Sequence, residues 1–383
     1  MGLFRKKQPL HGSRMVQTLP RSDAALPNPE PDNASCQLYQ ALRSSVPILD
    51  AAINKIIRLT GSFTLHCEEA SMQEALQQFA ESVPVGVSGI SLQTFADGYL
   101  DSLLTYGNAV GELLLEESSG TISGLLLARP DWVQIAPGKR PGLPCFSLRQ
   151  TGSEEPLPLP HPERICFTAL NPPPGKWYGT SILQGLPALS RILMRIYQCI
   201  GQNYDRMGNV RYAVTYRPSA DPAEQAYAGD RARQIAKEWS EGMRAGAHGE
   251  VRDFICAGDV EIKVIGADNP LLDTEVPVRQ LLEQLVAKLS IPPFLLGLNW
   301  STTERMSAQQ ADLLTSELEY YRRLLTPVLI RIATAFLRLS GSDSRVTVEW
   351  SNINLQDETE LAQARLHNAQ AQEIEQRINH PES

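Results

Sequence analysis

The sequence lacks the residue patterns on which metal and disulfide sites depend. Its six cysteines and six histidines are scattered, with no Cys-x-x-Cys pair and no His-x-x-x-His spacing. Neither a zinc site nor a disulfide framework is predicted, and a reducing cytosol is the default compartment. We therefore expect no metal and no other cofactor.

Long apolar runs and catalytic motifs are also missing. No stretch of about 18 uncharged apolar residues exists, because Arg331 and Arg338 interrupt the best candidate. The start, MGLFRKKQPL, has cations but no apolar core, so we expect neither a signal peptide nor a membrane partner. The motifs GxxxxGK[ST], GxSxG and HExxH are absent, and the sequence therefore nominates no catalytic residue.

Positive charge is scarce for a protein that would grip nucleic acid tightly. Over 383 residues the formal net charge is −8, with 42% hydrophobic and 20% charged residues. Such proportions are typical of a folded chain, and the length favours two or three subdomains. The acidic balance argues against a tight DNA binder, but it is compatible with a protein that DNA slides past.

Basic residues are nevertheless concentrated at the start of the chain. Residues 1–35 are rich in Pro and Ser, and residues 1–21 hold three arginines and two lysines without any acid. We interpret 1–35 as a flexible basic arm, which is either a solvated tail or a segment that docks on a partner.

Residues 36–180 combine helical and strand patterns. Apolar spacing predicts a helix over 37–58, which Pro47 kinks or restarts, and a second helix over 72–107. Two apolar runs separated by EESSG then predict a β-hairpin. The mixture predicts an α+β unit.

A basic helix face follows inside this acidic chain. Amphipathic spacing predicts a helix over 181–208, with Arg191, Arg195 and Arg206 opposite its apolar stripe. Residues 181–211 contain four arginines and one aspartate, and four minus one gives a local charge of +3. This face is either merely solvated or directed toward a partner.

The next segments predict a small α/β insertion over 209–268 and a further helix over 273–290. Pro292 and Pro293 end that helix, because each proline in a helix interior costs about 3 kcal/mol. We expect Phe294 and the two leucines after it to anchor the chain in a core.

A polar loop is predicted within 291–307. Its residues are unsuited to a core, and hydroxyl groups can make weak, exchangeable contacts with phosphate without reading sequence. The alternative is a surface loop with no partner. The loop residues singled out are Trp300, Ser301, Thr302, Thr303 and Arg305.

The last part of the chain predicts one long helix and a strand. Apolar residues recur at helical spacing over 308–339, and Pro327 is expected to bend this helix near its middle. A strand over 344–353 completes the segment 308–355, and 356–383 form an acidic terminal tail.

The order of these segments resembles the portal proteins of HK97-like tailed bacteriophages. YGNAVGELLLEE, KWYGTSIL, LLEQLVAKLSIPPFLLG and a long helix containing LLTPVL follow one another here as similar elements do in that family. The resemblance covers about 36–355. Each motif is short and apolar, so the likeness depends on their order and spacing.

The resemblance implies an α+β portal fold divided into named parts. In this scheme the segments are a wing (36–180), two stem helices (181–208 and 273–290), a small α/β clip (209–268), a tunnel loop (291–307), a long kinked wing helix with its strand (308–355) and a short crown (356–383).

The resemblance also implies a function. Copies of the chain would form a homo-oligomeric ring, usually a dodecamer, at one capsid vertex, through which double-stranded DNA is packaged and later ejected. The implied partners are further copies of the chain, DNA bound without sequence specificity, the terminase large subunit, the major capsid and scaffold proteins, and head-completion or adaptor proteins. The implied location is the virion, and the host cytoplasm during assembly.

Two other interpretations remain open. A minor capsid or adaptor protein without a channel would place residues 297–307 away from any symmetry axis. An enzyme that uses one of the acidic clusters would lose activity on a single Asp or Glu substitution, although the sequence does not say which.

Overall fold

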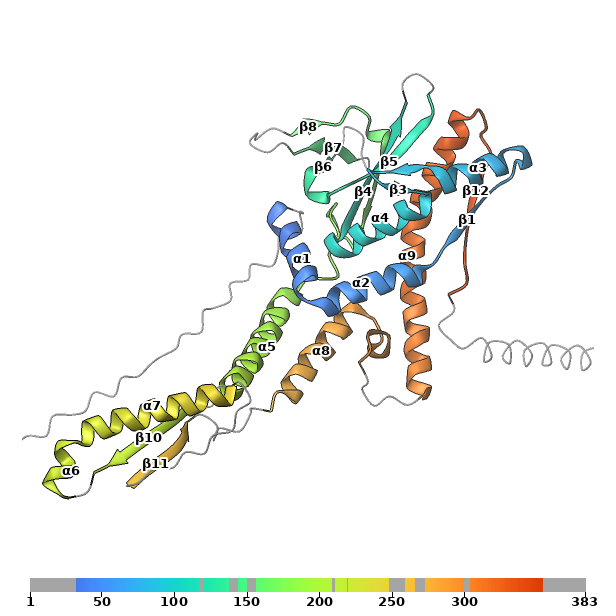
Figure 1. Ribbon diagram of the computed structural model, residues 1–383. Coiled ribbons are helices and arrows are strands. Elements are labelled where there is room, and N and C mark those ends of the chain that lie inside the picture. The colour runs from blue at the N-terminus through green and yellow to red at the C-terminus, as the bar shows by residue number, and fades with distance from the viewer. Residues whose placement is uncertain are drawn as a thin grey trace, which may run out of the picture. The chain divides into compact units, whose positions relative to one another are not determined.

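The computed structural model describes two compact units (Figure 1). Unit 1 comprises Met1–Gly185 with Lys288–Ser383, and unit 2 comprises Leu186–Ala287. Both contain helices and strands, which confirms the predicted α+β class. None of the helices described is long and apolar enough to cross a membrane. The structure describes residues 32–353 apart from 117–119, 138–143, 150–155, 209–210, 219, 248–258, 266–272 and 299–303.

The first predicted helix is two helices, α1 (Asn33–Ser45) and α2 (Pro47–Thr60). The Asp32 side chain caps α1 by accepting a hydrogen bond from the Ser35 amide. Pro47 starts α2, as expected of a residue that lacks an amide proton. The predicted basic arm lies outside the described residues up to residue 31, and its last three residues already belong to α1.

The single helix predicted over 72–107 is wrong. Two helices occupy this range, and Pro84 and the turn at Gly86, with a positive φ of 57°, interrupt the helical pattern between them. The predicted end of the second helix at Gly107 is confirmed, because this glycine adopts the left-handed conformation and caps the last turn. The elements are α3 (Ala70–Ser82), β2 (Pro84–Val85), β3 (Gly89–Ile90) and α4 (Leu92–Tyr106).

The predicted β-hairpin is confirmed and forms the middle of a five-stranded sheet. Strands β4 (Asn108–Leu115) and β5 (Ile122–Ala128) pair antiparallel, and the strand order is β3-β2-β5-β4-β9. Helix α4 packs on β4, where Gly111 leaves room for the ring of Phe95. Strand β9 (Ile165–Ala169) forms one edge, and β6 (Val133–Pro137), β7 (Pro144–Leu148) and β8 (Leu157–Pro158) form a separate small sheet.

The two short motifs YGNA and WYGTS contact each other in unit 1. The Asn108 side chain accepts a hydrogen bond from the Gly179 amide at 2.9 Å, and the Ser181 hydroxyl donates to the Thr105 carbonyl at 2.6 Å. A Cβ atom at Gly179 would overlap the Gly107 carbonyl, so only glycine fits there. This docked loop explains why the helix predicted over 181–208 begins only at Leu186.

Helix α9 (Glu304–Leu339) is the longest element described and packs against α2, α3, α4 and β12 (Val346–Trp350) (Figure 1). Its 36 residues span about 54 Å at 1.5 Å per residue. The predicted apolar stripe is buried from Leu314 to Ile332, whereas Leu339, the last helical residue, is 43% exposed. The helical assignment continues across Pro327, and the bend there stays a prediction.

A strand that the sequence did not predict joins the two ends of unit 1. β1 (Phe63–Cys67) pairs antiparallel with β12, so that Phe63 lies opposite Trp350. The Trp350 indole donates a hydrogen bond to the Thr326 hydroxyl of α9 at 3.0 Å. The guanidinium carbon of Arg322 lies 5.2 Å from the centre of the Trp350 ring, which adds a cation–π contact.

Unit 2 contains a two-stranded sheet and several helices. β10 and β11 pair antiparallel over seven residues, from Arg211 opposite Ile265 to Arg217 opposite Asp259. The first half of the β pair predicted before residue 259 lies outside the described residues. The elements are α5 (Leu186–Gly208), β10 (Arg211–Arg217), α6 (Pro222–Ala226), α7 (Ala228–Ala247), β11 (Asp259–Ile265) and most of α8 (Glu275–Leu289).

The buried stripe of α9 predicts a large effect of truncation. Leu318→Ala removes a side chain that is 0% exposed and should lower the free energy of unfolding by about 2–5 kcal/mol. Leu313 of the same helix is 70% exposed, so Leu313→Ala should change the free energy of unfolding by less than about 0.5 kcal/mol. Urea denaturation of both variants as monomers measures the difference, and equal effects would contradict this account of α9.

Candidate functional site

The predicted loop is framed by two ordered elements of unit 1. After α8, Ser290 takes a positive φ of 52°, and Ile291 is 2% exposed. A short 3₁₀ helix, η3 (Pro293–Leu296), then contacts α2, and Gly297 ends it in the left-handed conformation. On the other side of residues 299–303, α9 begins at Glu304. The two elements that flank the loop, η3 and α9, thus both contact α2.

The expected anchor of this loop is wrong in one respect. Phe294 is 39% exposed, and Leu295 and Leu296 are only partly buried. Ile291 and Pro292 are buried in their place. The turn at Ser290 moves the buried positions to the residues that directly follow α8.

The five predicted loop residues fall into two groups. Arg305 belongs to the first turn of α9, so the helix starts earlier than the predicted boundary at residue 308. The other four lie outside the described residues: Trp300, Ser301, Thr302 and Thr303.

The three predicted stem arginines all lie on α5. Arg191 and Arg195 are exposed, and the structure places Arg206 in the last turns of the helix. The apolar side of α5 is only partly covered, because Leu193 is 1% exposed but Tyr204 is 61% exposed. The structure therefore places these three arginines on one element of unit 2.

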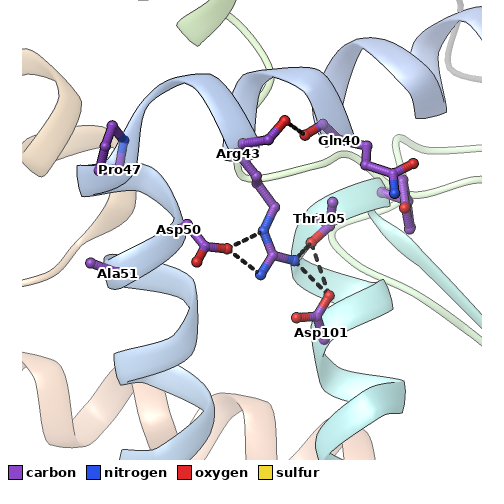
Figure 2. Close-up of a pocket in the computed structure, with 9 residues that line it drawn as sticks. Gln40, Arg43, Pro47, Asp50, Ala51, Asp101 and Thr105 are labelled. Carbon is purple, nitrogen blue, oxygen red and sulfur yellow. Dashed lines mark hydrogen bonds and ion pairs between the residues drawn. The ribbon is translucent and has the colours of Figure 1, made fainter.

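A groove that the sequence did not indicate lies between α1, α2 and α4. Arg43 reaches across it and donates hydrogen bonds to Asp50 at 2.7 and 2.9 Å, to Asp101 at 2.7 Å and to Thr105 at 2.8 Å (Figure 2). The groove encloses about 650 Å³ and is also lined by Gln40. These partners are 7, 58 and 62 positions from Arg43 along the chain, so no local sequence signal identifies them.

The charges around Arg43 indicate a structural role, in which Arg43 joins α1, α2 and α4; we call this contact the Arg43 joint. Burial opposes the charged form, but the hydrogen bonds and charges of Asp101 and Asp50 outweigh it and raise the pKa of the guanidinium. The side chain is 16% exposed, against 45% for Asp50 and 34% for Asp101. One cation thus ties three helices of unit 1 together.

Cys166 behaves as a buried structural residue, as its strand position suggests. It is 1% exposed on β9, and burial raises the pKa of its thiol to about 11. His161 is exposed and pairs with Glu163 at 3.0 Å. Among the described residues, no group of three or more His, Cys, Asp or Glu side chains could hold a metal ion.

No protein-family model and no curated protein sequence matches the chain. Among solved structures it is similar to a chain in the neck of a native gene transfer agent particle computed with C12 symmetry. The TM-score is 0.61 and the identity 18%, over 87% of this chain and 88% of that chain. A chain from the neck of an empty particle computed with C6 symmetry gives a TM-score of 0.63 and 18% identity, over 88% of this chain and 89% of that chain.

An HK97 family phage portal protein from Corynebacterium diphtheriae also matches, at 16% identity over 80% of this chain and 92% of that chain. Its TM-score of 0.41 is too low to establish a shared fold. The two neck chains match over most of their length, and their TM-scores exceed 0.6. The chain therefore has the fold of these particle-neck chains.

The Arg43 joint can be tested by substitution. Arg43→Ala leaves two carboxylates without their shared cation and should lower the free energy of unfolding by about 1–3 kcal/mol. Arg58→Ala, an exposed arginine on the neighbouring helix α2, should cost less than about 1 kcal/mol. Denaturant titration of both variants gives the comparison, and an Arg43→Ala variant as stable as the parent would refute the joint.

The thiols should differ sharply in reactivity. Burial raises the pKa of Cys36 to about 12 and that of Cys166 to about 11, from a usual 9.0, so at pH 8 their thiolate fractions fall by roughly a hundredfold or more. Cys145 and Cys199 are exposed and should be alkylated first. Peptide mapping after brief alkylation identifies the modified positions; labelling of Cys166 as fast as Cys199 would show that Cys166 is accessible.

Proposed function

We propose that this chain is a portal protein, a non-enzymatic subunit of a ring-shaped channel at one capsid vertex through which double-stranded DNA is packaged and ejected. The observation that carries the proposal is the shared fold. It extends over 87% of this chain and 88% of a chain in a particle neck computed with C12 symmetry. The order of the YGNA, WYGTS, IPPFLLG and LLTPVL motifs supports it independently.

The named parts follow from this proposal. The wing comprises 36–180 together with the long helix and strand of 308–355, and the docked YGNA and WYGTS motifs lie within it. The stem comprises α5 and α8, and the clip comprises the elements between them, β10 to β11. Residues 291–307 contain the tunnel loop, and 356–383 a short crown.

The channel must hold DNA loosely. DNA carries one charge per about 1.7 Å of axis, and proteins with roughly 6–10 phosphate contacts already bind with a strong dependence on salt. A single arginine from each of about twelve copies would exceed that number. Arg191, Arg195, Arg206 and Arg305 therefore face neighbouring copies or solvent for the most part, with at most one ring of them touching DNA transiently. The acidic balance of the chain supports such a low-friction channel.

The tunnel loop is the part that we assign to DNA. Hydroxyl groups at Ser301, Thr302 and Thr303 would exchange hydrogen bonds between successive phosphates without reading sequence. The flanking elements support this role, because η3 and α9, which bound the loop, both contact α2.

The remaining partners follow from the position at a capsid vertex. The clip would receive the terminase large subunit during packaging and the head-completion or adaptor proteins afterwards, and the wing would contact the major capsid and scaffold proteins. The location would be the virion, with assembly in the host cytoplasm. The alternative, a minor capsid or adaptor protein, shares these contacts but has no channel.

Electron microscopy tests the ring directly. Purified protein should form particles with a central hole in negative stain, because each copy would present complementary surfaces to two neighbours. Solid particles without a hole would favour the adaptor alternative, and monomers under all assembly conditions would contradict the proposal.

The loop has its own test. Replacing Trp300–Thr303 with glycine should leave rings intact and reduce nuclease-protected DNA per particle severalfold. The replacement stops before α9, because glycine within a helix costs about 1 kcal/mol per residue. Replacement of the exposed turn residues Val87 and Ser88 with glycine is the matched control and should package normally. Normal packaging by the loop variant would remove the loop's assigned role.

A further inference from the structure

Helix α5 carries exposed apolar side chains at a seven-residue spacing. Ile192 is 51% exposed, and Cys199, seven positions later, is also exposed. Tyr197 is 43% exposed and Tyr204, again seven positions later, 61% exposed. Residues seven apart return to nearly the same side of a helix, so each pair forms a row. At about 100° per residue the two rows lie on different sides of α5. Such rows are typical of a surface that packs against another helix.

Gly201 lies between the two tyrosines and points to the same conclusion. It is exposed in the interior of α5, and a Cβ atom there would meet no other atom within 4 Å. Glycine weakens a helix relative to alanine, and no contact among the described residues requires it at this position. Small residues at helix interfaces let two backbones approach closely. The glycine therefore forms a notch, bordered by Tyr197 and Tyr204, that suits a second helix.

The N-terminal half of α9 presents a matching surface. Leu313 is 70% exposed, and Met306, seven positions earlier, is 48% exposed. The neighbouring residues Leu314 and Leu318 are 2% and 0% exposed, so the buried stripe of α9 lies on another side. This half of α9 thus has one face inside unit 1 and an apolar row at its surface.

The two surfaces carry opposite charge. Residues 186–204 contain two arginines, Arg191 and Arg195, and no acid, which gives +2. Residues 306–321 contain Asp312, Glu317 and Glu319 and no Lys or Arg, which gives −3. Complementary charge on apolar helix surfaces fixes register and disfavours wrong partners.

We propose that α5 of one copy of this chain docks on the N-terminal half of α9 of the next copy. The inference rests on the proposed ring, because every copy carries both surfaces and the contact repeats from neighbour to neighbour until the ring closes. Leu313 of one copy lies against the notch at Gly201 of the other. The charged residues beside these rows, Arg191 and Arg195 on one copy and Asp312 and Glu319 on the other, set the register.

Cross-linking between cysteines tests the contact. Tyr204→Cys places a thiol at an exposed site beside Gly201, and Leu313→Cys introduces its proposed partner at an exposed site of α9. A short bis-maleimide added to assembled rings should convert the double variant into a ladder of covalent multimers on a denaturing gel. The ladder should be absent from the parent, from Leu313→Cys alone, whose native Cys199 lies on the other side of α5, and from Tyr204→Cys combined with Leu339→Cys, at the exposed far end of α9.

The outcomes separate this inference from the proposed function. Rings that give no ladder, or a cross-link that forms within single chains, would overturn the α5–α9 contact and leave the portal proposal standing. Absence of rings in the uncross-linked parent protein would overturn the portal proposal itself.

Gly201→Ala gives a second test, in which stability and assembly move in opposite directions. Alanine favours the helix, so the monomer should melt at a higher temperature, while a methyl group in the notch should lower the fraction of protein in rings severalfold. Gly242→Ala is the matched control, since Gly242 lies inside α7 and a Cβ atom there also meets nothing within 4 Å. It should raise the melting temperature and leave rings unchanged; ring formation by Gly201→Ala equal to that of the control would contradict the notch.

Discussion

The burial of one side of α9 is the constraint on which unit 1 depends. Leu318 and Ile332 are fully buried, and the helix contacts α2, α3, α4 and β12. Because these elements come from both ends of the chain, α9 unites segments that no local contact could hold together. Arg322 strengthens this junction, since its side chain donates to the Thr60 carbonyl at 2.8 Å and lies over the Trp350 ring.

The same helix determines what the predicted loop can do. The loop follows η3, which contacts α2, and it ends where α9 begins at Glu304. A polar segment held between two packed ends can reach a partner without unfolding its supports. The proposed portal role therefore needs weak hydrogen bonding from the loop but no catalysis, and this agrees with a sequence that nominates no catalytic residue.

The spacing of apolar residues was enough to predict the elements that local sequence specifies. The hairpin of β4 and β5 and the buried stripe of α9 follow from apolar spacing and turn residues alone. The break between α3 and α4 could have been predicted from Pro84, whose ring clashes with the helical backbone, and from Gly86, whose conformational freedom favours a turn. The pairing of Phe63 with Trp350 could not, because nothing in a five-residue strand specifies a partner so distant in sequence.

The candidate site was predicted less completely, for a similar reason. Arg191 and Arg195 were identified because they stand on one face of a periodic helix, whereas Arg43 was missed because Asp101 meets it only through the packing of α1 against α4. Phe294 looked like an anchor by composition, yet the turn at Ser290 buries Ile291 in its place. Side-chain direction after such a turn depends on backbone geometry that apolar composition does not encode.

We propose that residues 299–303 face the DNA path, and a photo-cross-linking residue substituted for Trp300 tests this placement most directly. Particles irradiated while they contain DNA should yield covalent protein–DNA adducts from this position and none from the same residue placed at Val87, in an exposed turn of unit 1. Adducts with protein only, at position 300, would place the loop away from DNA and contradict the account.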